Sequence, residues 1–403
     1  MSISRFSQPQ LIIVGAGPVG LCLANLTAQA GIETLVLEAE PAIATDLRAS
    51  TFHPPTLDML EALGITEKLL AQGLICPSWQ IRLHPSGERA VFDMSVLSGD
   101  TRHPYRLQCE QWKLSLALGE RLQRETRAEL RFSAKVTALR PSEDGVEVEI
   151  ATASGTETLT APYVIGCDGA RSTVRAALGV AFEGMTYPET TILATTRFPF
   201  EEYLDGISNV SYCWKEGGNF SLLKVPGRWR VSIYPQEDQP LEEQLTPRAI
   251  EESLQVIVPK PEAFEVLEVR PYRVHMRIVA NYRCGRVLLA GDAAHVNAPS
   301  GGMGLNGGIH DAFALAECLI AVLKNGAGED RFDLYDRRRR PVASDEILAQ
   351  ADRNRARMRE KDPARRRQLL GELQAVCADR ARLRTYLRRS SMIDGLERAA
   401  AIR

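Results

Sequence analysis

Residues 10–38 most constrain what this chain can fold into, because they combine a glycine-rich turn with apolar runs on both sides. A short apolar run ends at Gly15, and Gly17 and Gly20 follow in the spacing G-x-G-x-x-G. An apolar helical stretch then leads to a second apolar run that ends at Glu38. This order of strand, tight turn, helix and strand is the βαβ fingerprint of dinucleotide binding.

Each position in the turn has a physical reason. Gly15 allows the sharp turn, Gly17 lets a pyrophosphate approach the backbone, and Gly20 lets the helix lie close to the sheet. The helix N-terminus offers free N–H groups to phosphates, and Glu38 can accept hydrogen bonds from a ribose. An ordinary strand–helix turn fits less well because of the flanking strands and helix, and a signal peptide fits less well because glycines and a proline interrupt the apolar stretch. The predicted phosphate-binding residues are Gly15, Ala16, Gly17, Pro18, Val19 and Gly20.

The bulk properties indicate a globular chain with a sizeable core. The 403 residues suffice for two domains, and the net charge of −2 gives no general attraction to nucleic acid or membrane. We expect no membrane span, because no apolar run approaches the ~20 residues that a span needs. The eight cysteines include no C-x-x-C pair, so we expect free thiols, no metal site and a cytoplasmic location.

The pattern along the chain predicts an α/β fold with a discontinuous Rossmann-like domain and an inserted, mostly antiparallel β domain. A hairpin is expected within 79–92, a helix opening at Gln108, antiparallel strands within 129–159, and a helix after Thr246. A long apolar helix is expected from about Gly304. The predicted domains are 1–78, 104–185 and 280–335 for the nucleotide, 79–103 and 186–279 for the substrate, and a helical segment 336–403.

Two further segments place an aspartate after a buried strand. Asp168 follows one strand and Asp292 another, so both should lie at the ligand-binding edge of the sheet. Glycines at 302, 304 and 307 match the dinucleotide pattern by letter, but they follow a long loop and no second ribose-binding strand comes after them. We interpret them as space for a flat ring beside the N-terminus of a helix, where the helix dipole favours an anionic ring.

With these three motifs in order, the chain resembles the FAD-dependent aromatic hydroxylases, the para-hydroxybenzoate hydroxylase-like single-component flavoprotein monooxygenases. The resemblance covers nearly all of the first 325 residues. It implies that the first motif holds the FAD pyrophosphate, that Glu38 holds the adenosine ribose, and that Asp168 and Arg175 serve both FAD and the nicotinamide cofactor. The other cofactor-binding residues that it implies are Arg48, Gln108, Val136, Gly291, Asp292, Pro299, Gly304, Leu305 and Asn306.

The resemblance also implies a reaction. NADPH or NADH would reduce FAD, and the reduced flavin would react with O2 to give a C4a-hydroperoxide that hydroxylates a small phenolic or heteroaromatic substrate. Two alternatives stay open: a flavin-dependent dehydrogenase or reductase without oxygen transfer, and a non-catalytic flavin-binding interaction protein. A flavin-dependent halogenase is disfavoured, because the four tryptophans are too far apart for the W-x-W-x-I-P motif of that family.

The catalytic and substrate-binding residues are not identified by any motif. The β domain is expected to face the flavin with Tyr212, Trp214, Phe220, Arg230 and Tyr234, although each of these also suits a core or a surface. His53 follows Arg48 closely and is a weak candidate for the pocket, as Tyr212 and Tyr234 are for catalysis. His295 fits a structural role better than that of a base.

The C-terminal segment is rich in arginine. From residue 337 onward it holds 19 Arg and Lys against 9 Asp and Glu. Because it has few interleaved aromatic residues and no recognised nucleic-acid-binding pattern, we expect no nucleic-acid partner. We instead expect a solvated helical face that packs on the nucleotide domain or on a second subunit, which leaves a homodimer open.

Overall fold

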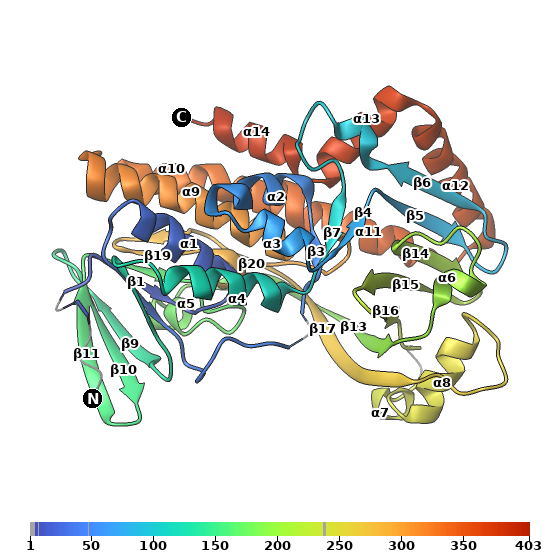
Figure 1. Cartoon of the computed structure of the whole chain (residues 1–403), viewed down its shortest axis with the longest axis horizontal. Helices are drawn as coiled ribbons and strands as arrows, with labels where there is room; N and C mark the ends of the chain where they lie inside the picture. The colour runs from blue at the N-terminus through green and yellow to red at the C-terminus, as the bar shows by residue number, and fades with distance from the viewer. Residues whose placement is uncertain (1–4, 7, 47, 237–238) are drawn as a thin grey trace.

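The computed structural model describes residues 5–6, 8–46, 48–236 and 239–403. Its first domain is built on a six-stranded sheet in the order β18-β19-β12-β1-β2-β8, in which only β18 is antiparallel (Figure 1). The central strand β1 is fully buried, as expected for a parallel sheet covered on both faces. The strands are β1 (Leu11–Val14), β2 (Thr34–Leu37), β8 (Ala128–Arg131), β12 (Tyr163–Gly166), β18 (Arg283–Cys284) and β19 (Val287–Leu289).

The helices of the first domain also pack against one another. Helix α1 (Pro18–Gln29) contacts both α4 (Gln111–Leu122) and α9 (Met303–Asn325), and α10 (Asp330–Val342) contacts α9. Among the described residues α9 is the one helix long and apolar enough to cross a membrane, so the premise that no apolar run reaches that length is wrong, while the expectation of no membrane span stays a prediction. Its apolar window is 67% buried, because the helix packs between α1 and α10 as a core helix does.

The second domain is an eight-stranded sheet in the order β20-β17-β13-β16-β15-β14-β5-β6. Figure 1 shows the long strands β13 and β17 running between the first domain and the second, and β13 continues through the boundary expected at residue 186. The early hairpin of β5 and β6 is confirmed, and it joins this sheet through β14. The strands are β5 (Ser78–Leu83), β6 (Arg89–Asp93), β13 (Phe182–Thr196), β14 (Val210–Lys215), β15 (Gly218–Val225), β16 (Arg228–Ile233), β17 (Val266–Val279) and β20 (His295–Val296).

Of the two helices predicted near Thr246 and Gln108, the structure contains the first and begins the second later. The helix after Thr246 is confirmed as α8 (Pro247–Gln255), with the Thr246 side chain accepting from the Ala249 amide. The helix expected to open at Gln108 is wrong, because Gln108 ends strand β7 and the helix begins at Gln111. Pairing with β3 and β4 on either side holds β7 in the extended conformation. These strands are β3 (Thr51–Phe52), β4 (Leu74–Cys76) and β7 (Arg106–Gln108).

The region expected to be antiparallel from 129 to 159 divides between two sheets. Strand β8 pairs parallel with β2 at the edge of the nucleotide-domain sheet, because Leu130 and its neighbours extend that core. The rest forms a three-stranded antiparallel sheet, which is the small sheet at the lower left of Figure 1. Its strands are β9 (Lys135–Pro141), β10 (Val146–Thr152) and β11 (Gly155–Ala161).

The C-terminal helices α12 and α13 cover the second domain, so the expectation of packing on the nucleotide domain holds only for α14, and packing on a second subunit stays a prediction. Helix α12 contacts β6, and α13 contacts the short helix η2, while α14 packs on α10. Trp79, Phe92 and Trp214 of the sheet share one apolar cluster with Leu370 and Leu387 of the tail. These helices bury the apolar side chains on this face of the sheet, which would otherwise be exposed to water. The elements are α11 (Ala349–Met358), α12 (Pro363–Ala378), α13 (Arg380–Ser390), α14 (Ile393–Ala401) and η2 (Met94–Leu97).

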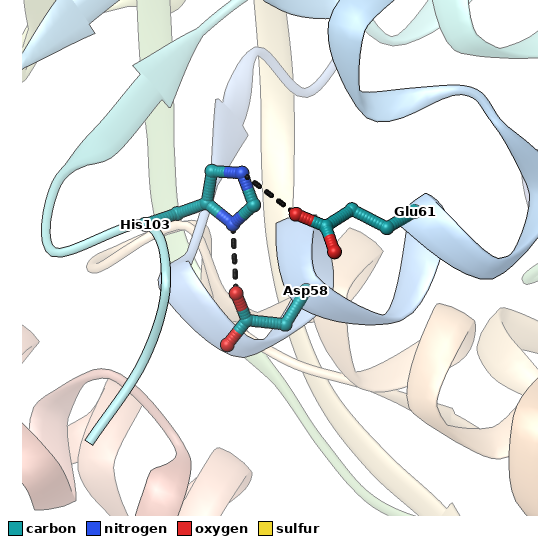
Figure 2. Close-up of side chains that lie close together, drawn as sticks. All are labelled: Asp58, Glu61 and His103. Atoms are coloured by element: carbon teal, nitrogen blue, oxygen red, sulfur yellow. Dashed lines mark hydrogen bonds and ion pairs between the residues drawn. The ribbon is translucent and has the colours of Figure 1, made fainter. Parts of the chain in front are cut away.

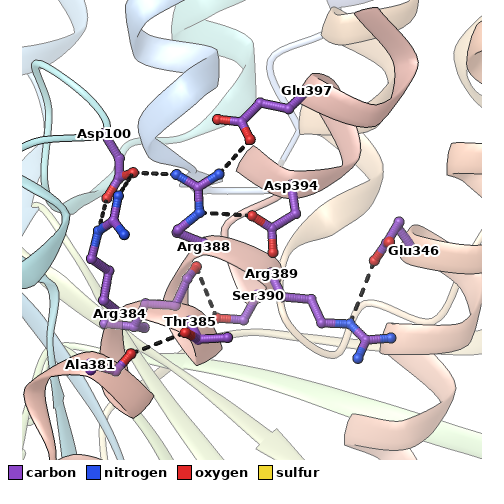
Figure 3. Close-up of polar contacts among 11 residues, drawn as sticks. Asp100, Glu346, Ala381, Arg384, Thr385, Arg388, Arg389, Ser390, Asp394 and Glu397 are labelled. Carbon is purple, nitrogen blue, oxygen red and sulfur yellow. Dashed lines mark hydrogen bonds and ion pairs between the residues drawn. The ribbon is translucent and has the colours of Figure 1, made fainter. Parts of the chain in front are cut away.

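Several arginines of this segment make ion pairs with nearby carboxylates. Arg384 and Arg388 both reach Asp100, whose side chain is 3% exposed, and Arg388 also contacts Asp394 and Glu397 (Figure 3). These contacts hold the turn after η2 against α13. Part of the excess positive charge of residues 337–403 is therefore compensated by a carboxylate elsewhere in the chain.

Arg366 provides a test of this covering role. It is buried, and its guanidinium donates to the carbonyl oxygens of Lys215, Gly218 and Glu360 at 2.6, 2.9 and 2.5 Å. We expect Arg366→Met to lower the free energy of unfolding by about 2–4 kcal/mol, because three partly buried carbonyls lose their donor. The measurement is urea unfolding.

The neighbouring Arg365 is the matched control. Its side chain is 45% exposed and lies 3.8 Å from Glu372, so Arg365→Met should change stability by less than about 0.5 kcal/mol. Equal losses in the two variants would show that the hydrogen bonds of Arg366 do not fasten the tail.

Candidate functional site

One cavity of about 960 Å³ extends from the turn after β1 to the eight-stranded sheet. This volume lies at the upper end of the range of roughly 300–1,000 Å³ seen for ligand cavities. Most residues selected from the sequence line it. They are Gly15, Ala16, Gly17, Pro18, Val19, Glu38, Arg48, Val136, Asp168, Tyr212, Tyr234, Asp292, Pro299, Gly304 and Leu305.

The turn after β1 is tightly packed on two sides and open on the third. Gly15 has φ +105°, and a Cβ there would lie 2.6 Å from the Cys167 carbonyl oxygen. A Cβ on Gly20 would lie 2.0 Å from the Gly15 carbonyl oxygen. At Gly17, by contrast, no atom of the described chain lies within 4 Å of such a Cβ. The open side at Gly17 faces the cavity and leaves room for a phosphate.

Glu38 and Arg48 both line the cavity. The Glu38 carboxylate accepts from the amides of Ala16 and Glu40 at 2.7 and 3.0 Å, which fixes it at the tip of β2. Arg48 contacts Asp46 at 2.9 Å, and its side chain is 66% exposed. A fixed acceptor and an exposed cation suit the ribose and phosphate parts of a dinucleotide.

The second and third motifs meet at the middle of the cavity. Asp168 accepts from Ser172 Oγ at 2.5 Å and from the Val174 amide at 3.1 Å, so it both holds its turn and lines the cavity. Arg175 donates to the Ala293 carbonyl oxygen at 3.0 Å and thereby ties the second motif to the third. Burial raises the pKa of Asp168 and of Asp292, although nearby hydrogen bonds and charges oppose the shift.

The N-terminus of α9 forms the next part of the wall. Gly302 precedes the helix with φ +69°, and Met303, Gly304 and Leu305 line the cavity beside Pro299. The first amides of a helix lack partners within the helix, and its dipole is positive at this end. This wall is therefore suited to the electron-rich edge of a flat ring.

Like Arg175, four other residues selected for the cofactor support the wall but do not line the cavity. Gly20 packs on Gly15 as described above. Gln108 Nε2 donates to Thr51 Oγ1 at 2.8 Å, and the Gly291 amide donates to Asp311 Oδ2 at 3.1 Å. Asn306 Nδ2 donates to the carbonyl oxygens of Thr51 and Gly302 at 2.9 and 2.7 Å.

His53 does not enter the cavity, which corrects the suggestion from the sequence. The residue is fully buried, and its Nε2 lies 2.8 Å from the Gly301 carbonyl oxygen, so this nitrogen carries the hydrogen. Burial, and then the nearby charge of Arg106, lower the pKa of His53 to about 3. The ring is neutral at ordinary pH and holds the loop at Gly301.

Replacing His53 tests this supporting role. We expect His53→Phe to weaken FAD binding roughly tenfold, because the Gly301 carbonyl loses a buried donor. The pH dependence of turnover between about pH 5 and 9 should stay unchanged, because a group with a pKa near 3 does not titrate there. His53→Gln, which keeps a donor, should recover part of the affinity measured by flavin fluorescence. A variant that loses a kinetic pKa in that range would contradict this assignment.

The far end of the cavity lies against the eight-stranded sheet. Tyr212, Arg230, Tyr234 and Tyr272 line it, and Arg230 Nη1 donates to Ser50 Oγ at 2.9 Å. Arg230 is 8% exposed, and burial raises the pKa of both Tyr234 and Tyr272. This end therefore combines hydroxyl groups with a largely buried cation.

Trp214 and Phe220 were expected to face the flavin, and this is wrong. Trp214 is covered by the C-terminal helices, with its Nε1 donating to the Arg357 carbonyl oxygen at 3.2 Å. Phe220 lies opposite Cys213 in the pairing of β14 with β15, and both pack in the core on the other face of the sheet. Strand alternation assigns the faces, but the sequence does not show which face the tail covers.

A buried charge network behind the third motif was not anticipated. Asp311 Oδ1 accepts from Arg339 Nε at 2.7 Å, and Asp311 Oδ2 lies 2.7 Å from His295 Nε2. Burial alone would raise the pKa of Asp311, but Arg339 and His295 lower it to about 2. Because Asp311 also binds the Gly291 amide, this network holds the loop that carries Asp292. His295 thus has the structural role that the sequence favoured.

Among the described residues, Asp58, Glu61 and His103 have donor atoms close enough to hold a metal, all within 4.8 Å of one another. Figure 2 shows His103 between the carboxylates, with Nδ1 2.7 Å from Asp58 and Nε2 3.3 Å from Glu61. Arg102 contacts both carboxylates, and Thr101 donates to Asp58 at 2.6 Å. These groups already occupy the positions that an ion would take, so we interpret the cluster as polar cross-links. That no metal binds stays a prediction.

The chain is similar to known flavoproteins along nearly its whole length. Residues 8–349 match the family described as FAD binding domain. The chain is 36% identical over 383 residues to para-nitrophenol 4-monooxygenase of Pseudomonas sp. (strain WBC-3), covering 94% of each chain. It is 36% identical over 347 residues to 6-hydroxy-3-succinoylpyridine 3-monooxygenase of Pseudomonas putida, covering 84% of this chain and 88% of the relative. The crystal structure of p-nitrophenol 4-monooxygenase from Pseudomonas putida DLL-E4 superposes with a TM-score of 0.90 at 33% identity, covering 98% and 99%.

Proposed function

This chain belongs to the FAD-dependent aromatic hydroxylases, and on that basis we propose that its substrate is a single-ring phenol or hydroxypyridine bound as its anion. The protein is a monooxygenase that uses FAD, NAD(P)H and O2. One oxygen atom of O2 enters the ring and the other leaves as water, while NAD(P)H supplies the two electrons. The single observation that carries the substrate class is the hydroxyl-lined and cationic far end of the cavity.

The cavity fits FAD by its shape and its donors. The open side at Gly17 and the N-terminus of α1 suit the pyrophosphate, Glu38 suits the ribose, and the N-terminus of α9 suits the ring. When bound, FAD supplies hydride acceptance from NAD(P)H and the activation of O2. The protein's own part is to orient the substrate, exclude water and hold charge near the reacting ring.

The substrate end suits a small ring with an ionised hydroxyl group. Arg230 provides a cation at this end, and Leu193 adds apolar surface. Hydroxyl donors come from three tyrosines, Tyr212, Tyr234 and Tyr272. Transfer of an electrophilic oxygen needs an electron-rich ring, which the anion of a phenol provides. The names of two relatives give a nitrophenol and a hydroxypyridine, each a single ring with a ring hydroxyl, which supports the same class for this chain.

A substrate panel tests the proposal. Holoenzyme is mixed with NAD(P)H and with 4-nitrophenol, 4-chlorophenol, 4-hydroxybenzoate or a hydroxypyridine, and NAD(P)H oxidation, O2 uptake and label from isotopic O2 in the product are recorded. We expect at least one of these compounds to accelerate oxidation and to gain one labelled oxygen. The matched control is 4-nitroanisole, which has the same ring but no ionisable hydroxyl and should gain none.

The alternatives give different outcomes in the same assay. A flavin-dependent reductase would oxidise NAD(P)H and release only peroxide with every compound. A non-catalytic flavin-binding protein would keep its flavin oxidised in the presence of NAD(P)H and each compound. Labelled product from 4-nitroanisole at the rate seen with 4-nitrophenol would contradict binding as the anion.

A further inference from the structure

Arg106 is a buried cation without a counter-ion among the described residues. It lies in β7, is 3% exposed, and has its guanidinium 4.8 Å from the centre of the Trp79 ring. Within the described ranges, its Nε and Nη1 atoms have no hydrogen-bond partner. The groups that favour its charged form are Tyr212, Tyr386 and Cys76, and none of these is a carboxylate.

Such an arrangement is unfavourable unless a negative charge arrives from elsewhere. An isolated charge in the protein interior costs several kcal/mol as an order of magnitude, and an arginine does not lose its proton to avoid that cost. The ring of His53 lies near Arg106 and is neutral, so it supplies no compensation. The face of the Trp79 ring offers only a weak attraction through its π system.

Tyr212 connects this cation to the cavity. Of the three groups that favour the charge of Arg106, Tyr212 is the one that lines the cavity. Its ring meets Trp79 edge to face, with the centroids 6.1 Å apart, so the same aromatic residue packs against both Arg106 and Tyr212. The tyrosine hydroxyl can therefore accept from the guanidinium on one side and donate into the cavity on the other.

We propose that Arg106 is a positioning residue that acts through the Tyr212 hydroxyl to stabilise the ionised ring hydroxyl of the substrate. An N–H of Arg106 donates to the Tyr212 oxygen, and the Tyr212 O–H donates to the substrate oxyanion. The proton that the phenol loses passes to solvent, and no other bond is made or broken. This inference rests on the proposed function, because it assigns a residue to the anionic form of that substrate.

Arg230 is the other buried cation at this end, and its surroundings differ. It donates to Ser50 at 2.9 Å, and the carboxylates of Glu110 and Glu268 favour its charged form. Part of its charge is thus compensated before any ligand enters. Among the described residues, no carboxylate compensates the charge of Arg106 in this way, so this is the charge that a bound anion would stabilise most.

The test uses the oxidised FAD-loaded enzyme without NAD(P)H and 4-nitrophenol as the probe, because its phenolate absorbs visible light. The spectrum of the bound probe is followed against pH. In wild type we expect the bound phenol to ionise at lower pH than in water. Arg106→Met should raise the pKa of the bound phenol by about one unit, a tenfold loss of preference for the phenolate. Arg106→Lys should keep most of the wild-type preference, and Tyr212→Phe should shift it in the same direction as Arg106→Met.

The matched control is Arg82→Met in β5, the strand that pairs with the Tyr212 strand β14. Arg82 is also 3% exposed, but it donates to the Asp205 carbonyl oxygen and does not line the cavity, so its loss should leave the pKa of the bound phenol unchanged. FAD content shows which variants fold. If Arg106→Met does not hold FAD, Tyr212→Phe decides alone, and an unchanged pKa there overturns the inference.

The outcomes separate this inference from the proposed function. Wild-type enzyme that binds 4-nitrophenol only as the neutral phenol, or not at all, would overturn the proposal of anion binding and this inference with it. Wild-type enzyme that favours the phenolate, with the same pKa in Arg106→Met and Tyr212→Phe, would overturn the role of Arg106 alone.

Discussion

Replacing Asp311 with asparagine should lower the free energy of unfolding by about 3–5 kcal/mol, because it leaves Arg339 as a buried charge without its partner. Both side chains are almost completely buried, and their Nε to Oδ1 distance is 2.7 Å. Asp311 also holds the Gly291 amide, so FAD content should fall together with stability. Thermal and urea unfolding of the holoprotein measure the first effect, and the flavin absorbance of the purified protein measures the second.

An exposed pair on the same two helices provides the control. Glu317 contacts Arg338 at 3.3 Å, and the Glu317 side chain is 68% exposed, so Glu317→Gln should cost less than about 1 kcal/mol. A loss at Glu317 as large as that at Asp311 would show that burial does not set the difference between the two pairs.

The pH dependence of stability gives an independent check on Asp311. Its pKa in the folded protein is about 2, below the roughly 3.9 of an unfolded chain. The stabilisation that it provides is therefore complete above about pH 4 and is lost as the pH falls toward 2. We expect the stability gap between wild type and Asp311→Asn to narrow over that range. A gap that stays constant from pH 6 to pH 2.5 would contradict a charged Asp311.

The elements near the nucleotide could be predicted because short stretches of sequence determine them. The turn after β1 needs glycine where a Cβ would meet backbone, and this requirement shows directly in the spacing of Gly15 and Gly20. Asp168 and Asp292 follow apolar strands, and parallel strands end at one edge of a sheet. Local pattern and global arrangement agree at these points, so the position of the cavity follows from the sequence.

The remaining features depend on partners that are distant in sequence. Gln108 lies in a strand because β3 and β4 pair with its neighbours, and the local pattern favours a helix equally well. Arg366 reads as a solvated charge, yet the carbonyl oxygens of a hairpin some 150 residues earlier bury it. The sequence likewise does not show that Arg106 is a buried cation. That property depends on the groups around its guanidinium, and among the described residues that favour its charge none is a carboxylate.

Replacing each of two glycines of the first motif by alanine should have different effects: Gly20→Ala should lower stability, and Gly17→Ala should lower the affinity for FAD. Gly20→Ala places a Cβ 2.0 Å from the Gly15 carbonyl oxygen, so α1 must move away from β1. We expect a loss of more than about 4 kcal/mol in stability and little soluble holoprotein. Gly17→Ala meets no described atom within 4 Å, and its φ of −73° suits any residue. Its apoprotein should unfold within about 0.5 kcal/mol of the wild-type apoprotein.

The methyl group of Gly17→Ala instead occupies the space through which a pyrophosphate approaches the backbone. Loss of one or two hydrogen bonds to a charged phosphate corresponds to about 1.5–3 kcal/mol, so the Kd for FAD should rise roughly 10- to 150-fold. Titration of apoprotein with FAD, followed by flavin fluorescence, measures this change, and apoprotein melting provides the stability comparison. Wild-type FAD affinity in Gly17→Ala would mean that the phosphates do not lie against this turn. A stable, flavin-loaded Gly20→Ala would mean that the helix can shift without disturbing the cavity.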